Sequence, residues 1–179
     1  MIYLFLGGCR SGKSRAALLQ AEQIGADRKI FVATCQPQDA EMLARVERHR
    51  QERDATWETL EEPLEIAAIV SQHSRPQTVI LVDCLTLWLT NLIVGEADET
   101  ALSQRIATLT EALARARGPV LLVANEVGMG IVPDNAMSRR FRDWAGSLNQ
   151  QVARCAREVI LTVAGIPVPI KSAAPKGRV

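Results

Sequence analysis

The stretch GGCRSGKS at residues 7–14 constrains the fold more than any other feature of this chain. It follows five apolar residues, IYLFL at 2–6, and opens a helical pattern at 13–25. The spacing G-x-x-x-x-G-K-S between a buried strand and a helix is typical of a loop that cradles phosphate groups. Its glycines let backbone N–H groups turn toward phosphate oxygens, and the helix N-terminus adds a favourable dipole. Residues 7–14, here called the phosphate loop, therefore predict an α/β protein that binds a nucleoside triphosphate.

The rest of the chain repeats the alternation of strand and helix. Continuous apolar runs, typical of parallel strands covered on both faces, lie at 29–33, 78–83, 119–125 and 158–165. Two prolines make 166–171 an edge strand. Helical patterns lie at 38–54, 63–73, 84–94, 100–117 and 135–157. The order predicts a single α/β domain over 1–171, with a mostly parallel sheet flanked by helices, and a C-terminal tail at 172–179.

The charge, the apolar runs and the cysteine content of the chain limit its expected partners and its expected compartment. The chain has 21 Lys+Arg and 20 Asp+Glu, a net charge of +1, which predicts no nucleic-acid partner. No apolar run approaches the roughly 20 residues that span a bilayer, so we expect no membrane insertion. The four cysteines lie far apart and lack zinc-ligand spacing. Reduced thiols in a cytoplasmic protein are the expectation.

In a parallel sheet, ligands bind at the carboxyl ends of the strands. Lys13 should therefore reach the β- and γ-phosphates as a catalytic group, and Ser14 should ligate Mg²⁺. Asp83 ends the apolar run TVILVD and is the expected second Mg²⁺ ligand. The alternative for Asp83 is an ordinary helix N-cap.

Two further segments leave alternatives open. Asn125 and Glu126 follow the fourth strand, in a loop that either positions substrate or senses the γ-phosphate, or is a plain glycine-bearing turn before a helix start at Pro133 and Asp134. Arg139, Arg140 and Arg142 lie on one predicted helix. Arginine is a frequent phosphate ligand, but a solvated helix face is the favoured interpretation.

His49 is one of two histidines and sits among arginines and glutamates in ARVERHRQER. On a helix, Met42, Val46, His49 and Arg53 form one stripe, which places His49 beside the apolar face. The neighbouring arginines disfavour its protonation and keep a lone pair available. His49 is thus either a member of a charged, solvated helix or a nucleophile that attacks an α-phosphorus.

Several motifs together resemble one known family, the bifunctional adenosylcobinamide kinase/adenosylcobinamide-phosphate guanylyltransferases of cobalamin biosynthesis. They are GGCRSGKS, VAT, ERHRQERDATWETLEEP, DCLTLWLTNL, and NEVGMGIVP with the following RRFRDWAGSLNQ. The resemblance covers residues 2–171 and implies a P-loop NTPase fold of RecA-like type and a homotrimer. It also implies two reactions. ATP or GTP phosphorylates the aminopropanol hydroxyl of adenosylcobinamide, and GMP then passes from GTP to adenosylcobinamide phosphate through a histidine–GMP intermediate, giving adenosylcobinamide-GDP.

The resemblance assigns His49 as the guanylylated histidine. It also implies a set of nucleotide contacts: Gly7, Gly8, Cys9, Arg10, Ser11, Gly12, Lys13, Ser14, Val32, Ala33, Thr34, Arg50, Gln51, Glu52, Arg53, Glu61 and Asp83. Two other classes remain open on the residues alone. One is a small-molecule kinase without guanylyl transfer, in which His49 is structural. The other is a nucleotide-dependent binding module or switch of RecA type.

Overall fold

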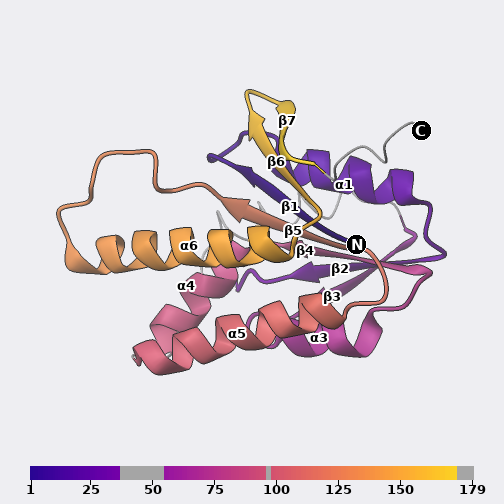
Figure 1. Cartoon of the computed structure of the whole chain (residues 1–179), viewed down its shortest axis with the longest axis horizontal. Coiled ribbons are helices and arrows are strands. Elements are labelled where there is room, and N and C mark those ends of the chain that lie inside the picture. Colours follow the sequence, from indigo (N-terminus) through magenta and orange to yellow (C-terminus); the bar gives the residue numbers. More distant parts are fainter. Residues whose placement is uncertain (37–54, 96–97, 173–179) are drawn as a thin grey trace, which may run out of the picture.

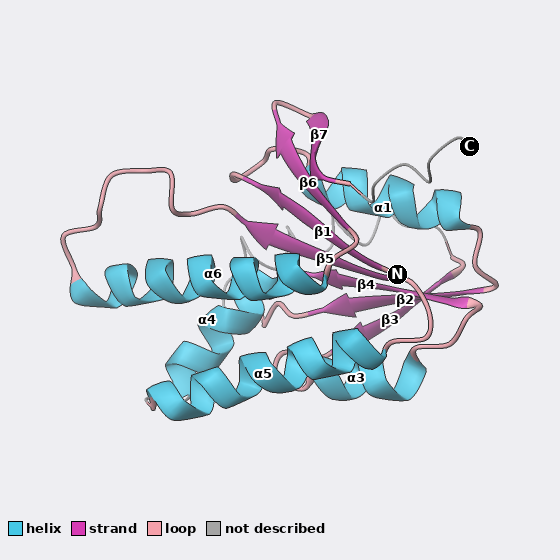
Figure 2. Ribbon diagram, viewed as in Figure 1, coloured by secondary structure: helices cyan, strands magenta, loops and turns pink. Residues whose placement is uncertain are grey.

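A computed structural model of the chain describes residues 1–36, 55–95 and 98–172. The strands in these ranges form one seven-stranded sheet in the order β3-β2-β4-β5-β1-β6-β7, and helices cover both of its faces (Figures 1 and 2). Every neighbouring pair is parallel except β6 and β7. The strands are β1 Ile2–Gly7, β2 Arg28–Ala33, β3 Trp57–Glu61, β4 Thr78–Asp83, β5 Val120–Asn125, β6 Glu158–Val163 and β7 Ile166–Lys171. The helices are α1 Lys13–Ile24, α3 Ile66–His73, α4 Leu85–Gly95, α5 Glu99–Arg115 and α6 Ala136–Cys155.

Side chains of the central strands alternate between two apolar layers. Leu4, Ile80 and Leu122 point into the layer that packs against α3, α4, α5 and α6. Phe5, Leu81 and Val123 point into the layer that packs against α1. Because both faces are covered, these strands are apolar throughout, which explains why their sequence runs are continuous. The predicted α/β architecture is confirmed.

Most predicted elements are present, with shifted ends. The run at 158–165 ends as a strand at Val163, because Ala164 and Gly165 have φ angles of 51° and 81° and turn the chain back. The edge strand at 166–171 forms as β7 and pairs antiparallel with β6. The helix expected at 38–54 lies entirely outside the described residues, so it stays a prediction.

One strand of the sheet was not predicted. β3 has the sequence WETLE, with only two apolar residues. In the segment 33–62 the sequence pattern indicates a helix and no strand. Among the described strands, β3 forms an edge of the sheet and pairs with β2 alone, and Glu58, Thr59 and Glu61 are exposed. Charged residues are common on exposed edge strands, where they discourage pairing with other chains.

The strand order decides which candidate residues lie together. All strands except β7 end at the same edge of the sheet, here called the carboxyl edge. β5 lies between β1 and β4, and its last residue, Asn125, is in register with Gly7. Asp83 at the end of β4 is therefore one strand farther from the phosphate loop than Asn125 is.

Candidate active site

The phosphate loop joins β1 to α1 and requires glycine at two positions. A Cβ on Gly7 would lie 2.5 Å from the Thr162 carbonyl oxygen and 2.4 Å from Ser11 Oγ. Gly12 has a φ of 94°, a left-handed conformation, and caps the N-terminus of α1. Both glycines therefore shape the turn that leads into the helix.

Lys13 is the first residue of α1 and folds back over the loop. Its side chain is buried, and Nζ donates a hydrogen bond to the Gly8 carbonyl oxygen at 3.1 Å. Ser14 follows in the same first turn and is half-buried. The positive charge and the helix N-terminus thus lie together, an arrangement that favours a bound phosphate.

Two hydroxyl groups beside the phosphate loop have no partner among the described residues. Ser11 Oγ and Thr162 Oγ1 are both buried and lack a hydrogen bond there. The Gly165 N–H also donates to the Ser11 carbonyl oxygen at 2.8 Å, which packs the β6–β7 turn against the loop. Thr162 was missed in the sequence because it lies 150 residues from the motif and inside an ordinary apolar run.

Asp83 ends β4 with a half-buried side chain and precedes Cys84, to which it is joined by a cis peptide bond. Burial, and then the charge of Asp83, raise the pKa of the Cys84 thiol to about 11. The thiol is therefore neutral at physiological pH and is no nucleophile.

The oxygen donors at this edge suit magnesium. No group of three or more His, Cys, Asp and Glu side chains in the described part of the chain would hold a metal ion alone. A serine hydroxyl and one carboxylate, Ser14 and Asp83, match instead a Mg²⁺ ion whose other ligands are phosphate oxygens and water.

Residues 32–34 are engaged with their neighbours at the end of β2. Val32 and Thr34 are fully buried. Thr34 Oγ1 donates to the Cys84 carbonyl oxygen at 2.7 Å and accepts from the Cys84 N–H at 2.9 Å. Only Ala33 has a partly exposed side chain. These residues fix the end of β2 against β4, and their predicted contact with GTP stays a prediction.

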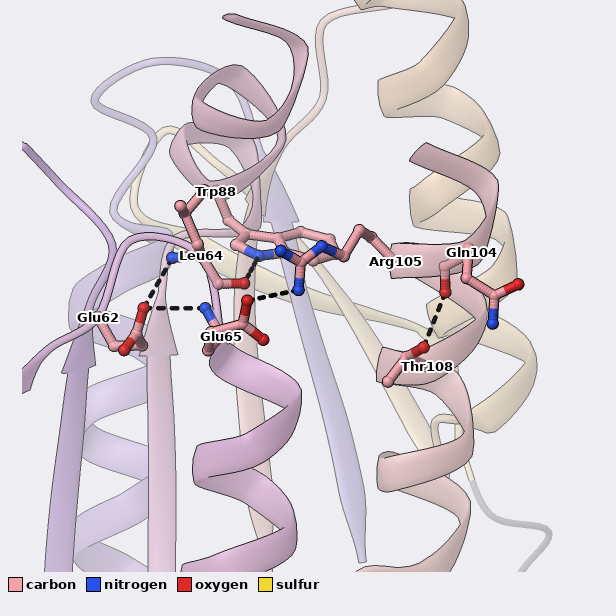
Figure 3. A network of polar contacts seen from close by, with 7 residues as sticks. All are labelled: Glu62, Leu64, Glu65, Trp88, Gln104, Arg105 and Thr108. Carbon is pink, nitrogen blue, oxygen red and sulfur yellow. Dashed lines mark hydrogen bonds and ion pairs between the residues drawn. The ribbon is translucent and has the colours of Figure 1, made fainter. Parts of the chain in front are cut away.

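Helix α4 holds the chain where it leaves β2 and where it returns from β3. Asn91 Nδ2 donates to the carbonyl oxygens of Thr34, at 2.9 Å, and Pro63, at 3.1 Å. Trp88 Nε1 donates to the Leu64 carbonyl oxygen at 2.8 Å (Figure 3). His49 lies in the sequence between these two fixed points.

The turn after β3 is also stabilised by side-chain contacts of its own residues. Glu62 Oε1 accepts hydrogen bonds from the N–H groups of Leu64 and Glu65, and Arg105 of α5 binds Glu65 (Figure 3). Glu61, a predicted nucleotide contact, is exposed just before this turn. It lies four strands from β1, roughly 19 Å at 4.8 Å per strand. The phosphate loop and Glu61 therefore do not meet at the same phosphate group.

The turn at 125–128 lies beside the phosphate loop and is held on several sides. The Glu126 N–H donates to the Gly7 carbonyl oxygen at 3.1 Å. The Asn125 N–H donates to Thr86 Oγ1 of α4 at 2.7 Å, and Asn149 of α6 donates to the Asn125 carbonyl oxygen at 3.3 Å. The 125–128 turn is thus an ordered part of the carboxyl edge.

The arginines in the first two turns of α6, Arg139, Arg140 and Arg142, have partners within the chain. Arg142 donates to the Gly128 carbonyl oxygen at 2.7 Å. Arg139 donates to the carbonyl oxygens of Pro133 and Asp134, and Arg140 pairs with Glu99 at 2.6 Å. Arg139 and Arg142 bind backbone carbonyl groups of the segment between β5 and α6. This face of α6, which was expected to be only solvated, therefore also stabilises that segment.

The remaining candidate residues are His49, Arg50, Gln51, Glu52 and Arg53. All five lie outside the described residues. The structure brings together the phosphate loop, Asp83 and the 125–128 turn, and it places Ala33 and Glu61 farther along the same edge.

The sequence matches known proteins over almost its full length. The cobinamide kinase / cobinamide phosphate guanyltransferase family matches residues 3–170. The bifunctional adenosylcobalamin biosynthesis protein CobP of Pseudomonas aeruginosa is 45% identical over 171 residues, which cover 94% of this chain and 96% of the relative. The corresponding protein CobU of Escherichia coli is 42% identical over 183 residues, which cover 96% of this chain and 100% of the relative.

A solved structure of the RadB recombinase is similar in fold, with a TM-score of 0.51 at 14% identity over 89% of this chain and 73% of that one. This similarity agrees with the predicted RecA-like P-loop NTPase fold. The family match and the two relatives together show that the chain belongs to the cobinamide kinase / cobinamide phosphate guanyltransferase family.

Proposed function

We propose that this protein catalyses two successive reactions of cobalamin biosynthesis. In the first, it phosphorylates adenosylcobinamide with ATP or GTP. In the second, it transfers GMP from GTP to adenosylcobinamide phosphate through a histidine–GMP intermediate and releases pyrophosphate. The family match over residues 3–170 is the observation that carries this proposal.

The phosphate loop can serve both reactions because both must neutralise a triphosphate. Lys13 supplies a positive charge, and the backbone N–H groups of the loop and the start of α1 supply donors. Mg²⁺ would be held by Ser14 and Asp83 and would neutralise further phosphate charge. The position of the attacking group then selects the reaction, because a hydroxyl at the γ-phosphorus gives phosphorylation and a histidine at the α-phosphorus gives nucleotidyl transfer.

His49 is the proposed nucleophile of the second reaction. Its imidazole nitrogen forms a bond to the α-phosphorus of GTP, and the bond from that phosphorus to the pyrophosphate breaks. The phosphate of adenosylcobinamide phosphate then displaces the histidine and gives adenosylcobinamide-GDP. Glu61, Arg50, Gln51, Glu52 and Arg53 are proposed contacts of the nucleotide.

A His49→Ala variant tests the proposal. We expect it to accumulate adenosylcobinamide phosphate and to form no adenosylcobinamide-GDP, because phosphorylation needs only the phosphate loop, the metal ion and the substrate hydroxyl. The measurement is product analysis together with transfer of label from α-labelled GTP to the protein. Label on another residue of the variant, or equal loss of both reactions with the fold preserved, would contradict the role of His49.

The same labelling experiment on the natural sequence separates the three classes of function. An acid-labile bond between protein and GMP is expected only of the guanylyltransferase. Phosphorylated adenosylcobinamide without such a bond would indicate a kinase alone. Nucleotide binding with neither product would indicate a RecA-type binding module or switch.

We further propose a homotrimer in the cytoplasm. The segment before α6 and its first turn expose four large apolar side chains: Met129, Ile131, Val132 and Met137. Contiguous exposed apolar side chains favour burial against another protein, here a second copy of the chain. The four cysteines form no disulfide bond, as is usual for cytoplasmic proteins. No helix in the described part of the chain is long and apolar enough to cross a membrane.

A further inference from the structure

The phosphorylation step needs a group that accepts the proton of the attacking hydroxyl, and the residues assigned so far do not supply one. Lys13 and the phosphate loop carry positive charge or donate hydrogen bonds, and Asp83 is assigned to the metal. A carboxylate close to the γ-phosphate would fill this role. The carboxyl edge holds several acids, and their contacts decide which of them fits.

The acids at the end of β3 do not fit. Glu61 lies four strands from β1. Glu62 Oε1 accepts from the N–H groups of Leu64 and Glu65, both at 2.9 Å, and so serves the start of α3. Both residues are too far along the edge to reach a phosphate group held by the phosphate loop.

Glu126 does fit, because the sheet places it next to the phosphate loop. β5 is the direct neighbour of β1, and Asn125 is in register with Gly7. Glu126 is the next residue, and its N–H donates to the Gly7 carbonyl oxygen at 3.1 Å. Glu126 is therefore an acid of the carboxyl edge whose backbone contacts the phosphate loop directly.

The carboxylate of Glu126 is held in place and is half-buried. Oε1 accepts a hydrogen bond from the Gly128 N–H at 2.6 Å. Gly128 is itself fixed, because its carbonyl oxygen accepts from Arg142 at 2.7 Å. One oxygen thus orients the carboxylate and leaves the other available for a substrate, as a general base requires.

We infer that Glu126 is the catalytic base of the phosphorylation step, an inference that rests on the proposed function. The substrate hydroxyl oxygen forms a bond to the γ-phosphorus of ATP or GTP. The bond from that phosphorus to the bridging oxygen breaks, and a nucleoside diphosphate leaves. The hydroxyl proton passes to Glu126, which releases it to water after the product departs. The guanylyl transfer uses a phosphate and a histidine as nucleophiles and does not need this base.

A Glu126→Gln variant tests the inference, since the amide keeps the oxygen that accepts from Gly128 but no longer takes a proton. We expect the kcat of adenosylcobinamide phosphorylation to fall about 100-fold or more, the usual range for loss of a general base, with the KM for ATP within about threefold. Labelling of the protein by α-labelled GTP should persist, as should GMP transfer to adenosylcobinamide phosphate that is added directly. This outcome is the reverse of that expected for His49→Ala.

An Asp134→Asn variant is the matched control. Asp134 is an exposed acid of the same segment between β5 and α6, and its substitution removes the same charge. We expect both reactions to be retained in it. If Glu126→Gln does not fold, Glu126→Asp keeps a shorter carboxylate and should slow phosphorylation about tenfold while sparing guanylyl transfer.

Several outcomes would overturn the inference. They are normal phosphorylation by Glu126→Gln, an equal fall of both reactions, and the same loss in Asp134→Asn. Absence of phosphorylation by the natural sequence would instead reject the proposed function, so the two failures are distinguishable.

Discussion

Lys13 is the residue on which both reactions should depend most directly. Its buried side chain lies over the phosphate loop, where Nζ donates to the Gly8 carbonyl oxygen. Lys13→Ala should therefore abolish both phosphorylation and guanylyl transfer while the free energy of unfolding changes little. Loss of one preorganised electrostatic group usually costs about 10²–10³ in rate. Rate measurements and denaturant unfolding check this, and normal activity would contradict the assignment of the phosphate loop.

Asp83 should act on the metal more than on the nucleotide. Asp83→Asn keeps the size of the side chain and removes the charge that would hold Mg²⁺ at the end of β4. Turnover should then require a higher Mg²⁺ concentration, with a smaller change in nucleotide affinity. The measurement is rate against Mg²⁺ concentration. A curve identical to that of the natural sequence would leave Asp83 with only a structural role before α4.

At the scale of single residues, motif spacing predicted positions better than side-chain partners. Lys13 and Asp83 lie at the carboxyl edge of the sheet, as the predicted ends of their strands require. The Thr34 hydroxyl, however, is occupied by the backbone of Cys84. Neither that pairing nor the Thr162 hydroxyl, which has no hydrogen-bond partner in the described ranges, can be read from the sequence, because each depends on strands that are distant in the chain. A pairing between strands is set by tertiary packing and leaves no local pattern.

At the scale of elements, α4 connects the ends of β2, β3 and β5. Asn91→Leu should destabilise the fold by about 1–3 kcal/mol, because the carbonyl oxygens of Thr34 and Pro63 both lose their donor. The shift in the urea unfolding midpoint measures it. Thr90→Val is the control, since Thr90 donates only within α4, to the Thr86 carbonyl oxygen, and the change should cost little. Equal effects of the two variants would refute a special role for Asn91.

The sequence predicted elements with strong apolar runs and missed the one without such a run. β3 forms because β2 offers an unpaired edge and because Trp57 packs against Phe31, not because WETLE has a strong strand pattern. Likewise, the helical pattern at 63–73 begins three residues late, at Ile66. Pro63 and Leu64 are held instead as a turn by Asn91 and Trp88.

At the scale of the whole molecule, the apolar side chains of the segment before α6 should decide assembly. Ile131 is 98% exposed. Burial of such a side chain contributes about 1.5–3 kcal/mol, so Ile131→Asp should dissociate the proposed trimer while its circular dichroism stays unchanged. Analytical ultracentrifugation measures the mass. Leu19→Asp, at an exposed position of α1, is the control and should remain a trimer. A monomeric natural sequence, or no change with Ile131→Asp, would contradict this prediction.

The position of β1 inside the sheet, between β5 and β6, also affects folding during synthesis on the ribosome. The phosphate loop follows β1 directly, yet β1 pairs with β5 and β6, which begin more than 100 residues later, at Val120 and Glu158. Contacts between such distant segments form only after a long chain has been closed into a loop, and this slows folding. The nascent chain therefore carries its nucleotide-binding motif without these neighbouring strands until β5 and β6 have been synthesised. An N-terminal fragment that stops before β5 would contain the entire motif and bind no nucleotide.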